Sequence, residues 1–199
     1  MAGVLPTIPT VPLPRRPPGR SGAWERARWW YESGLGWPTA PGTPLRLRTG
    51  VRFDVLDVPA GAGHAALARS TPGFPVALRA GRMLLLVAAG GADELPGLLD
   101  WLEWGSLTLD LRAIGAGGHV EAPLPPEPGP AGLPPTATDR DGSQGAAVWL
   151  RPPEPGGEVE ASLPTLSASG GAGTAPDLAR LVHTLATQCH RIRLSRTAR

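Results

Sequence analysis

The sequence contains no lysine, a single cysteine and no long apolar run, and each absence excludes a class of protein. One cysteine excludes an internal disulfide framework and a cysteine-rich zinc site, so zinc is not an expected cofactor. No apolar stretch approaches the roughly 18 residues of a membrane-spanning helix, so we expect no membrane partner. Without lysine there is no GxxxxGK[ST] phosphate loop, and the GxSxG, HExxH and CxxC motifs are missing as well.

Glycine and proline, in contrast, are abundant, with 27 and 25 among 199 residues. This excess lies near the composition of disordered chains, yet 41% of the residues are hydrophobic and seven are Trp. The composition therefore predicts a folded part joined to segments without a core. All 19 basic residues are Arg, and the net charge is only +2. Arginine suits phosphate recognition, although a high-GC coding sequence explains the overall bias more simply.

Proline and glycine mark the segments that we expect to be disordered. Prolines recur through residues 1–22, which excludes helix and central strand and predicts a Pro-rich arm. This stretch is unlike a secretory signal, so we expect a cytoplasmic protein. Residues 123–145 and 152–175 are expected to form a flexible loop and a low-complexity linker. The folded domain is then expected within residues 23–155, with a C-terminal helix and basic tail in residues 176–199.

Hydrophobic periodicity predicts the elements of a single α+β domain. The expected helices cover residues 23–34, 60–69, 93–104 and 177–194. The expected strands cover residues 51–58, 76–78, 83–89, 107–111, 119–122 and 146–151, and residues 36–43 are expected to form a loop. The run Leu84–Val87 has no polar face, which is typical of a central, buried strand.

Two carboxylates on the predicted strand 51–58 are candidate ligands for a divalent metal, which takes hard oxygen ligands. Asp54 and Asp57 are three positions apart, and because side chains alternate along a strand, they point to opposite faces. They cannot share a metal unless a bulge intervenes. The simpler interpretation is that one of them ends the strand and caps the helix that follows Pro59.

A second group of candidates surrounds the predicted strand 107–111. Asp110 and Arg112 lie on one face of that pattern, which suits a metal–triphosphate site or a plain cross-strand ion pair. Arg82 stands at the mouth of the buried strand, where it can reach a phosphate, although a surface arginine is the commoner case. The four histidines have no metal-ligand neighbours in the sequence, so we expect structural roles for them.

Five motifs follow one another over roughly residues 23–155: GWPTAPGT, FDVLDVPAGAGHAALAR, PVALRAGRMLLLV, LTLDLRAIGAGGHVEAPLPP and AVWLRPP. The most specific is LDLRAIGAGGHVEAP, with an Asp, a basic residue and then Gly-Gly-x-Val-x-Ala-Pro. Their order resembles the bifunctional DNA primase/polymerase N-terminal (Prim-Pol) domain, in its short actinobacterial stand-alone form. The resemblance implies an archaeo-eukaryotic primase core with a mixed or antiparallel RRM-like sheet. It also implies DNA replication chemistry, namely nucleotide polymerisation by two-metal phosphoryl transfer.

The resemblance also assigns roles to single positions. Asp57 and Asp110 stand at acidic positions of the family's catalytic, metal-binding motifs, with Mg²⁺ or Mn²⁺ as the implied cofactor if the domain is active. Pro59 occupies the second acidic position of the first motif, and Leu84 stands where the family has a phosphate-binding His. A Cys/His-rich insertion that many members carry after the position of Thr43 is absent. We therefore expect a nucleotide- or nucleic-acid-binding domain with impaired polymerase chemistry.

The expected phosphate contacts are Arg82, Arg112 and the Gly117–Gly118 loop, with a nucleotide or DNA as the partner. Two alternatives stay open. An active template-dependent nucleotidyltransferase requires a divergent metal site. A non-catalytic scaffold uses the Pro-rich arm and loops to dock proteins.

Overall fold

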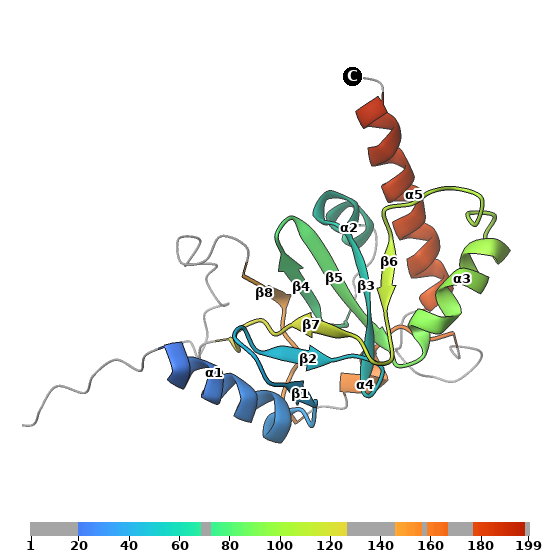
Figure 1. Ribbon diagram of the computed structural model, residues 1–199. Helices are drawn as coiled ribbons and strands as arrows, with labels where there is room; N and C mark the ends of the chain where they lie inside the picture. Colours follow the sequence, from blue (N-terminus) through green and yellow to red (C-terminus); the bar gives the residue numbers. More distant parts are fainter. Residues whose placement is uncertain (1–19, 69–72, 127–145, 157–158, 167–176, 198–199) are drawn as a thin grey trace, which may run out of the picture.

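The computed structural model describes residues 20–68, 73–126, 146–156, 159–166 and 177–197. In these residues the strands form two antiparallel sheets, one of five strands and one of three, and helices pack around them (Figure 1). The predicted α+β class is confirmed. Every helix in the described residues is too short or too polar to span a bilayer.

The larger sheet has the strand order β6-β3-β5-β4-β8. Its strands are β3 (Phe53–Pro59), β4 (Val76–Arg79), β5 (Arg82–Ala88), β6 (Arg112–Ile114) and β8 (Val148–Arg151). β5 lies at the centre, and its apolar run is buried, as predicted. Ala80 and Gly81 connect β4 to β5 with positive φ at both residues (47° and 76°), the conformation that a two-residue hairpin turn favours.

Helices cover one face of this sheet. They are α2 (Ala60–Leu67), α3 (Gly91–Trp101) and α5 (Leu178–Thr197), and each contacts β3. Gly63 permits the close approach of α2 to β5, because a Cβ at this position would lie 2.2 Å from Sδ of Met83. This packing buries the even-numbered face of β3, including Leu56 and Val58.

Asp54 points into the helical layer, and its side chain caps a helix. Oδ2 accepts hydrogen bonds from the backbone amides of Gly90 (2.9 Å) and Ala92 (3.0 Å) at the start of α3. A carboxylate is favourable there because the first amides of a helix lack intrahelical partners. The expected cap on the helix after Pro59 is wrong, since α2 begins without a side-chain cap. The cap belongs to a helix more than 30 residues further along the chain.

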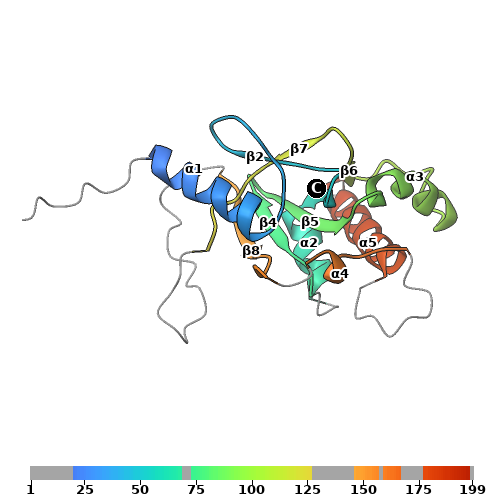
Figure 2. The same ribbon diagram turned by 90° about the horizontal axis from the view of Figure 1, so that it is seen from below.

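The smaller sheet lies over the other face of the larger one (Figure 2). It has the order β1-β2-β7, from β1 (Thr39–Ala40), β2 (Arg46–Arg48) and β7 (His119–Glu121). Helix α1 (Arg20–Trp29) and the π-helical turn η1 (Trp30–Gly34) precede it.

Aromatic residues fill the core beside the smaller sheet. The Trp37 ring lies between those of Tyr31 and Phe53, with centroid distances of 6.2 and 4.5 Å. The Tyr31 hydroxyl donates to the Pro123 carbonyl and accepts from the Trp149 indole, at 2.7 and 3.1 Å. Burial raises the pKa of Tyr31 far above its ordinary value, so its hydroxyl stays protonated and can keep donating.

Further sequence expectations differ from the structure. Helix α1 begins at Arg20, inside the expected Pro-rich arm of residues 1–22. Residues 107–111 are not a strand, because β6 begins at Arg112 and the preceding segment lies against α5. Residues 36–43, expected to be a loop, contain β1. Residues 152–175, expected to be a linker, include α4 (Val159–Ser162), where Val159 is buried. Most of the expected arm and loop, at positions 1–19 and 127–145, lies outside the described residues, as do positions 157–158 and 167–175 of the expected linker.

Candidate functional site

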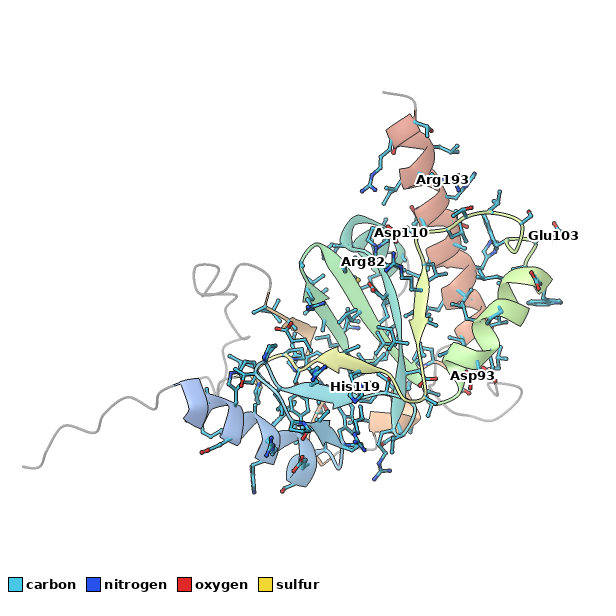
Figure 3. The ribbon with its side chains drawn as sticks, in the orientation of Figure 1. Arg82, Asp93, Glu103, Asp110, His119 and Arg193 are labelled. Carbon is cyan, nitrogen blue, oxygen red and sulfur yellow. The ribbon has the colours of Figure 1, made fainter. Side chains whose placement is uncertain are left out.

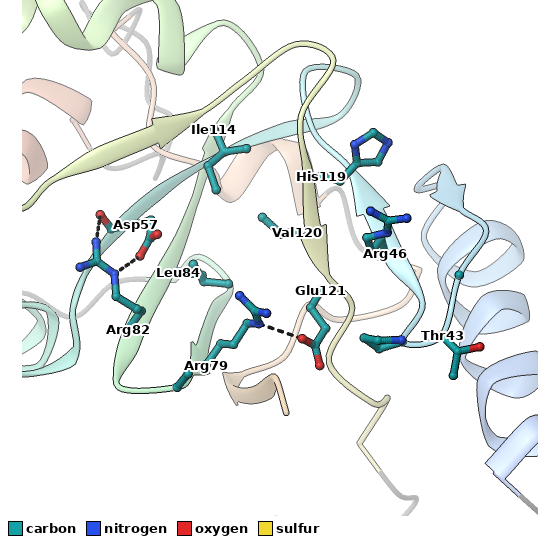
Figure 4. Close-up of a pocket in the computed structure, with 13 residues that line it drawn as sticks. Thr43, Arg46, Asp57, Arg79, Arg82, Leu84, Ile114, His119, Val120 and Glu121 are labelled. Carbon is teal, nitrogen blue, oxygen red and sulfur yellow. Dashed lines mark hydrogen bonds and ion pairs between the residues drawn. The ribbon is translucent and has the colours of Figure 1, made fainter. Parts of the chain in front are cut away.

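A pocket of about 390 Å³ opens between the two sheets (Figure 4). Its apolar lining comes from Leu84 of β5, Ile114 of β6 and Val120 of β7. Charged and titratable side chains surround this apolar part: Arg46, Asp57, Arg79, Arg82, His119 and Glu121. The pocket therefore combines a small hydrophobic surface with several charged groups of both signs.

Arg82 joins the two aspartates that the sequence singled out. Its Nε donates to Oδ1 of Asp57 at 2.7 Å, and its Nη1 donates to Oδ1 of Asp110 at 2.6 Å. Its Nη2 also donates to the Asp57 carbonyl at 3.1 Å. Figure 3 shows Arg82 beside Asp110, near α5. Two carboxylates from separate segments thus meet at one guanidinium. Asp57 lies on the opposite sheet face from Asp54, as the strand alternation predicted.

The guanidinium of Arg82 stays charged in this position. Partial burial alone lowers its pKa, but the hydrogen bonds to Asp110 and Asp57 outweigh burial and raise the pKa above its ordinary value. The pair with Asp110 is the more solvated one, since the Asp110 side chain is 45% exposed and that of Asp57 only 18%. Arg82 therefore supplies a permanent positive charge between two carboxylates.

Arg82 occupies the position between the two aspartates at which a divalent metal was expected. Mg²⁺ is commonly held by one or two carboxylates with waters and substrate phosphates, and here the guanidinium already holds Oδ1 of both Asp57 and Asp110. The described residues contain no group of three or more His, Cys, Asp or Glu that could hold a metal ion. Leu84, directly opposite Asp57 in the β3–β5 register, offers no polar atom.

A separate ion pair connects the two sheets. Arg79, at the end of β4, donates from Nε to Oε2 of Glu121 on β7 at 2.8 Å. The other oxygen of Glu121 accepts the Ala147 amide at 3.3 Å, just before β8. This pair holds the smaller sheet against the β4–β5 hairpin and closes one side of the pocket.

The remaining predicted phosphate contacts lie outside the pocket lining. Arg112 is opposite Asp57 in the β3–β6 register, so it is on the same sheet face, and it is exposed. The Gly117–Gly118 loop packs against Thr49 instead: the Gly118 amide donates to Gly115 O, and Gly118 O accepts the Thr49 amide. A Cβ on Gly118 would lie 2.6 Å from Cγ2 of Ile114, so this glycine serves packing.

Sequence reasoning missed four residues of the pocket. Arg79 and Glu121 form the ion pair between the sheets, and Arg46 and His119 lie at the opposite side from Arg82 (Figure 4). The alternation Arg46-Leu47-Arg48 was the available signal, but three residues are too few to establish a strand period.

Cys189 of α5 lies behind the site and is expected to react slowly. Its Sγ is 3.6 Å from the Asp110 carbonyl oxygen. Burial, with a smaller contribution from the Asp110 charge, raises the pKa of the thiol from 9.0 to about 11, against an opposing effect of Arg82. Because the thiolate is the nucleophile, iodoacetamide at pH 8 should alkylate the folded protein ~100-fold more slowly than the denatured chain.

Mass spectrometry of timed samples measures both alkylation rates. The raised pKa also means that the thiol's contribution to folding is complete below pH 9.0 and is lost as the pH rises to about 11. Equal alkylation rates in native buffer and in denaturant would contradict the buried position of Cys189.

Comparison with known proteins adds no relative: the chain matches no family model, no curated protein and no solved structure. A functional assignment therefore depends on the geometry of the pocket.

Proposed function

We propose that this chain is a primase/polymerase-like domain that binds a nucleotide or nucleic acid in the pocket between its sheets, with impaired polymerase chemistry. The observation that carries the proposal is the meeting of Asp57 and Asp110 at the Arg82 guanidinium. Two acidic side chains from non-adjacent segments meet at one internal cation, and Asp57 and Arg82 line the pocket.

The order of the elements supports a primase-like core. β3-α2-β4-β5-α3-β6 is a β-α-β-β-α-β succession, and its four strands lie in the order β6-β3-β5-β4. That succession is typical of ferredoxin-like sheets, to which the RRM-like core of the family is related. The pocket lies on the sheet face away from α2 and α3, where a ligand has access.

The pocket chemistry favours a phosphate ligand. Guanidinium groups bind phosphate oxygens bidentately, and three arginines line the pocket. Arg79 and Arg82 already pair with carboxylates, so Arg46 is the lining arginine without a carboxylate partner in the described residues. A volume of about 390 Å³ lies within the range of small-molecule sites. No Phe, Tyr or Trp is among the lining residues of the described part, so the stacking of bases on aromatic rings in RRM domains has no counterpart here. Recognition through phosphates is the better fit.

The same residues explain why the chemistry is impaired. In phosphoryl transfer, metal ions neutralise the charge that develops on the transferred group and position it. Arg82 brings a single charge that two carboxylates already balance. Leu84 cannot donate a hydrogen bond to a phosphate. The pocket is therefore suited to binding without transfer.

Nucleotide titration and primer extension test the proposal together. Calorimetry in EDTA should detect ATP or dATP binding, which Arg46→Gln weakens ~10-fold, as expected when a charged phosphate contact worth about 1.4 kcal/mol is lost. The matched control is Arg180→Gln, an exposed arginine on α5 in the helical layer. A primed template with dNTPs and Mg²⁺ or Mn²⁺ should not be extended.

Two outcomes would overturn parts of the proposal. Robust extension that Asp110→Ala abolishes would show an active nucleotidyltransferase. Absence of both nucleotide and nucleic-acid binding would favour a protein-interaction scaffold.

A further inference from the structure

One face of the smaller sheet carries a cluster of charged side chains. In the antiparallel β2–β7 register, Arg46 is opposite Glu121 and Arg48 is opposite His119. Opposed and alternate residues share a sheet face, so these four side chains lie together. Leu47 and Val120, at the intervening positions, are 1% and 8% exposed, so the other face packs into the core. The charged face is therefore the one that does not pack into the core.

Both carboxylate oxygens of Glu121, the acidic residue on this face, already accept hydrogen bonds. Glu121 uses Oε2 for Arg79 and Oε1 for the Ala147 amide. Although Glu121 is opposite Arg46, no ion pair joins them within the part of the chain that the structure describes. Arg48 likewise has no carboxylate partner there, and both arginines are exposed. Arg46, Arg48 and His119 thus form a strip, called here the β2–β7 strip, in which the charges of the two arginines are not neutralised locally.

The β2–β7 strip begins at the pocket and leads away from it. Arg46 and His119 line the pocket, on the side opposite Asp57 and Arg82, whereas Arg48 does not line it (Figure 4). Alternate residues of a strand are about 6.6 Å apart, which lets Arg46 and Arg48 contact successive phosphate groups of one chain. Across the strip, one residue of β2 is opposite one residue of β7. This width suits a single phosphate backbone rather than the two backbones of a duplex.

We propose that the β2–β7 strip binds the phosphate backbone of a single-stranded nucleic acid whose end reaches the pocket. The inference rests on the proposed nucleotide binding and adds the path of the strand. Arg46 contacts the phosphate at the pocket, and Arg48 contacts a phosphate outside it. A free nucleotide therefore reaches Arg46 but not Arg48, and this difference separates the two ligands.

The Arg48→Gln variant tests the strip. Fluorescence anisotropy with a labelled oligo-dT of about 12 nucleotides should show ~5–10-fold weaker binding, and the slope of log K against log salt should fall by about 0.7, the value for one phosphate contact to a single strand. ATP affinity should stay within about twofold. Arg48→Lys should keep most of the affinity for the oligonucleotide, because it keeps the charge. Arg180→Gln is the control for loss of charge alone.

Three other results would contradict the inference, and the last of them would also contradict the proposed function. If ATP binds but Arg48→Gln leaves oligonucleotide binding and its salt slope unchanged, the strip is not the strand path and only the proposed function stands. If Arg48→Gln weakens ATP as much as the oligonucleotide, Arg48 belongs to the nucleotide pocket and the inference fails. If the unaltered protein binds neither ligand, the proposed function fails together with the inference.

Discussion

Replacing Arg82 with glutamine is expected to make the stability of the protein depend on divalent cations. The variant loses the charge that separates Asp57 from Asp110, and the two carboxylates then repel each other. Removing one partner of a buried pair costs about 3–5 kcal/mol, but Asp110 is 45% exposed, so solvent screening reduces the expected loss to about 1–2 kcal/mol. Mn²⁺ can then take the place of the guanidinium between the carboxylates.

Thermal unfolding of the Arg82→Gln variant with and without Mn²⁺ measures how much stability the ion restores. With a dissociation constant of about 1 mM, as in weak carboxylate sites, about 10 mM Mn²⁺ would restore about 1.4 kcal/mol. The unaltered protein should show no such shift. The matched control is Arg79→Gln, which frees the single carboxylate of Glu121 in the same pocket and should not respond. An equal response of the unaltered protein would mean that Arg82 does not occupy the position between the aspartates.

The sequence singled out the two aspartates that meet at Arg82 but did not predict how their charge is balanced. Asp57 and Asp110 came from a resemblance of motifs, and strand alternation separated Asp57 from Asp54. Arg82 was expected to reach a phosphate. The structure instead gives its Nε and Nη1 to the aspartates, because the two-residue turn places it at the start of β5 beside both. Periodicity within one strand contains no information on such contacts between segments.

The errors in the fold have a similar cause. The segment Leu107–Leu111 alternates like a strand, but the carbonyls of Thr108 and Asp110 accept hydrogen bonds from Arg193 and Cys189 of α5. Its backbone groups therefore have partners outside the sheet, and pairing with β3 starts only at Arg112. β1 and β2 have two and three residues, too few for a pattern. Long apolar periods, as in β5 and α5, were predicted correctly because burial alone determines them.

Gly50 joins β2 to β3, and its replacement by alanine is expected to have the largest effect on stability. Its φ is +81°, and a Cβ there would lie 2.2 Å from Cα and 2.6 Å from N of Ala116. These are backbone atoms, so no side-chain rotation relieves the clash. Left-handed backbone costs a residue with a Cβ about 1–2 kcal/mol, and overpacking adds about 1–3 kcal/mol. Urea unfolding should show a loss of about 2–5 kcal/mol, a large fraction of a typical domain's stability.

Gly117→Ala is the matched control for this prediction, because Gly117 has φ +76° but no atom within 4 Å of the position that a Cβ would take. This variant should lose only the stability that the left-handed backbone costs a residue with a Cβ, about 1–2 kcal/mol. The difference between the two variants measures the contact between the Thr49–Gly50 turn and the 115–118 loop, which also holds the Thr49 hydroxyl on Gly115 O at 2.5 Å. That contact ties β2 to the larger sheet, so Gly50→Ala should also weaken ATP binding in the pocket. Equal losses in both variants would mean that the loop moves aside and that the pocket does not depend on this contact.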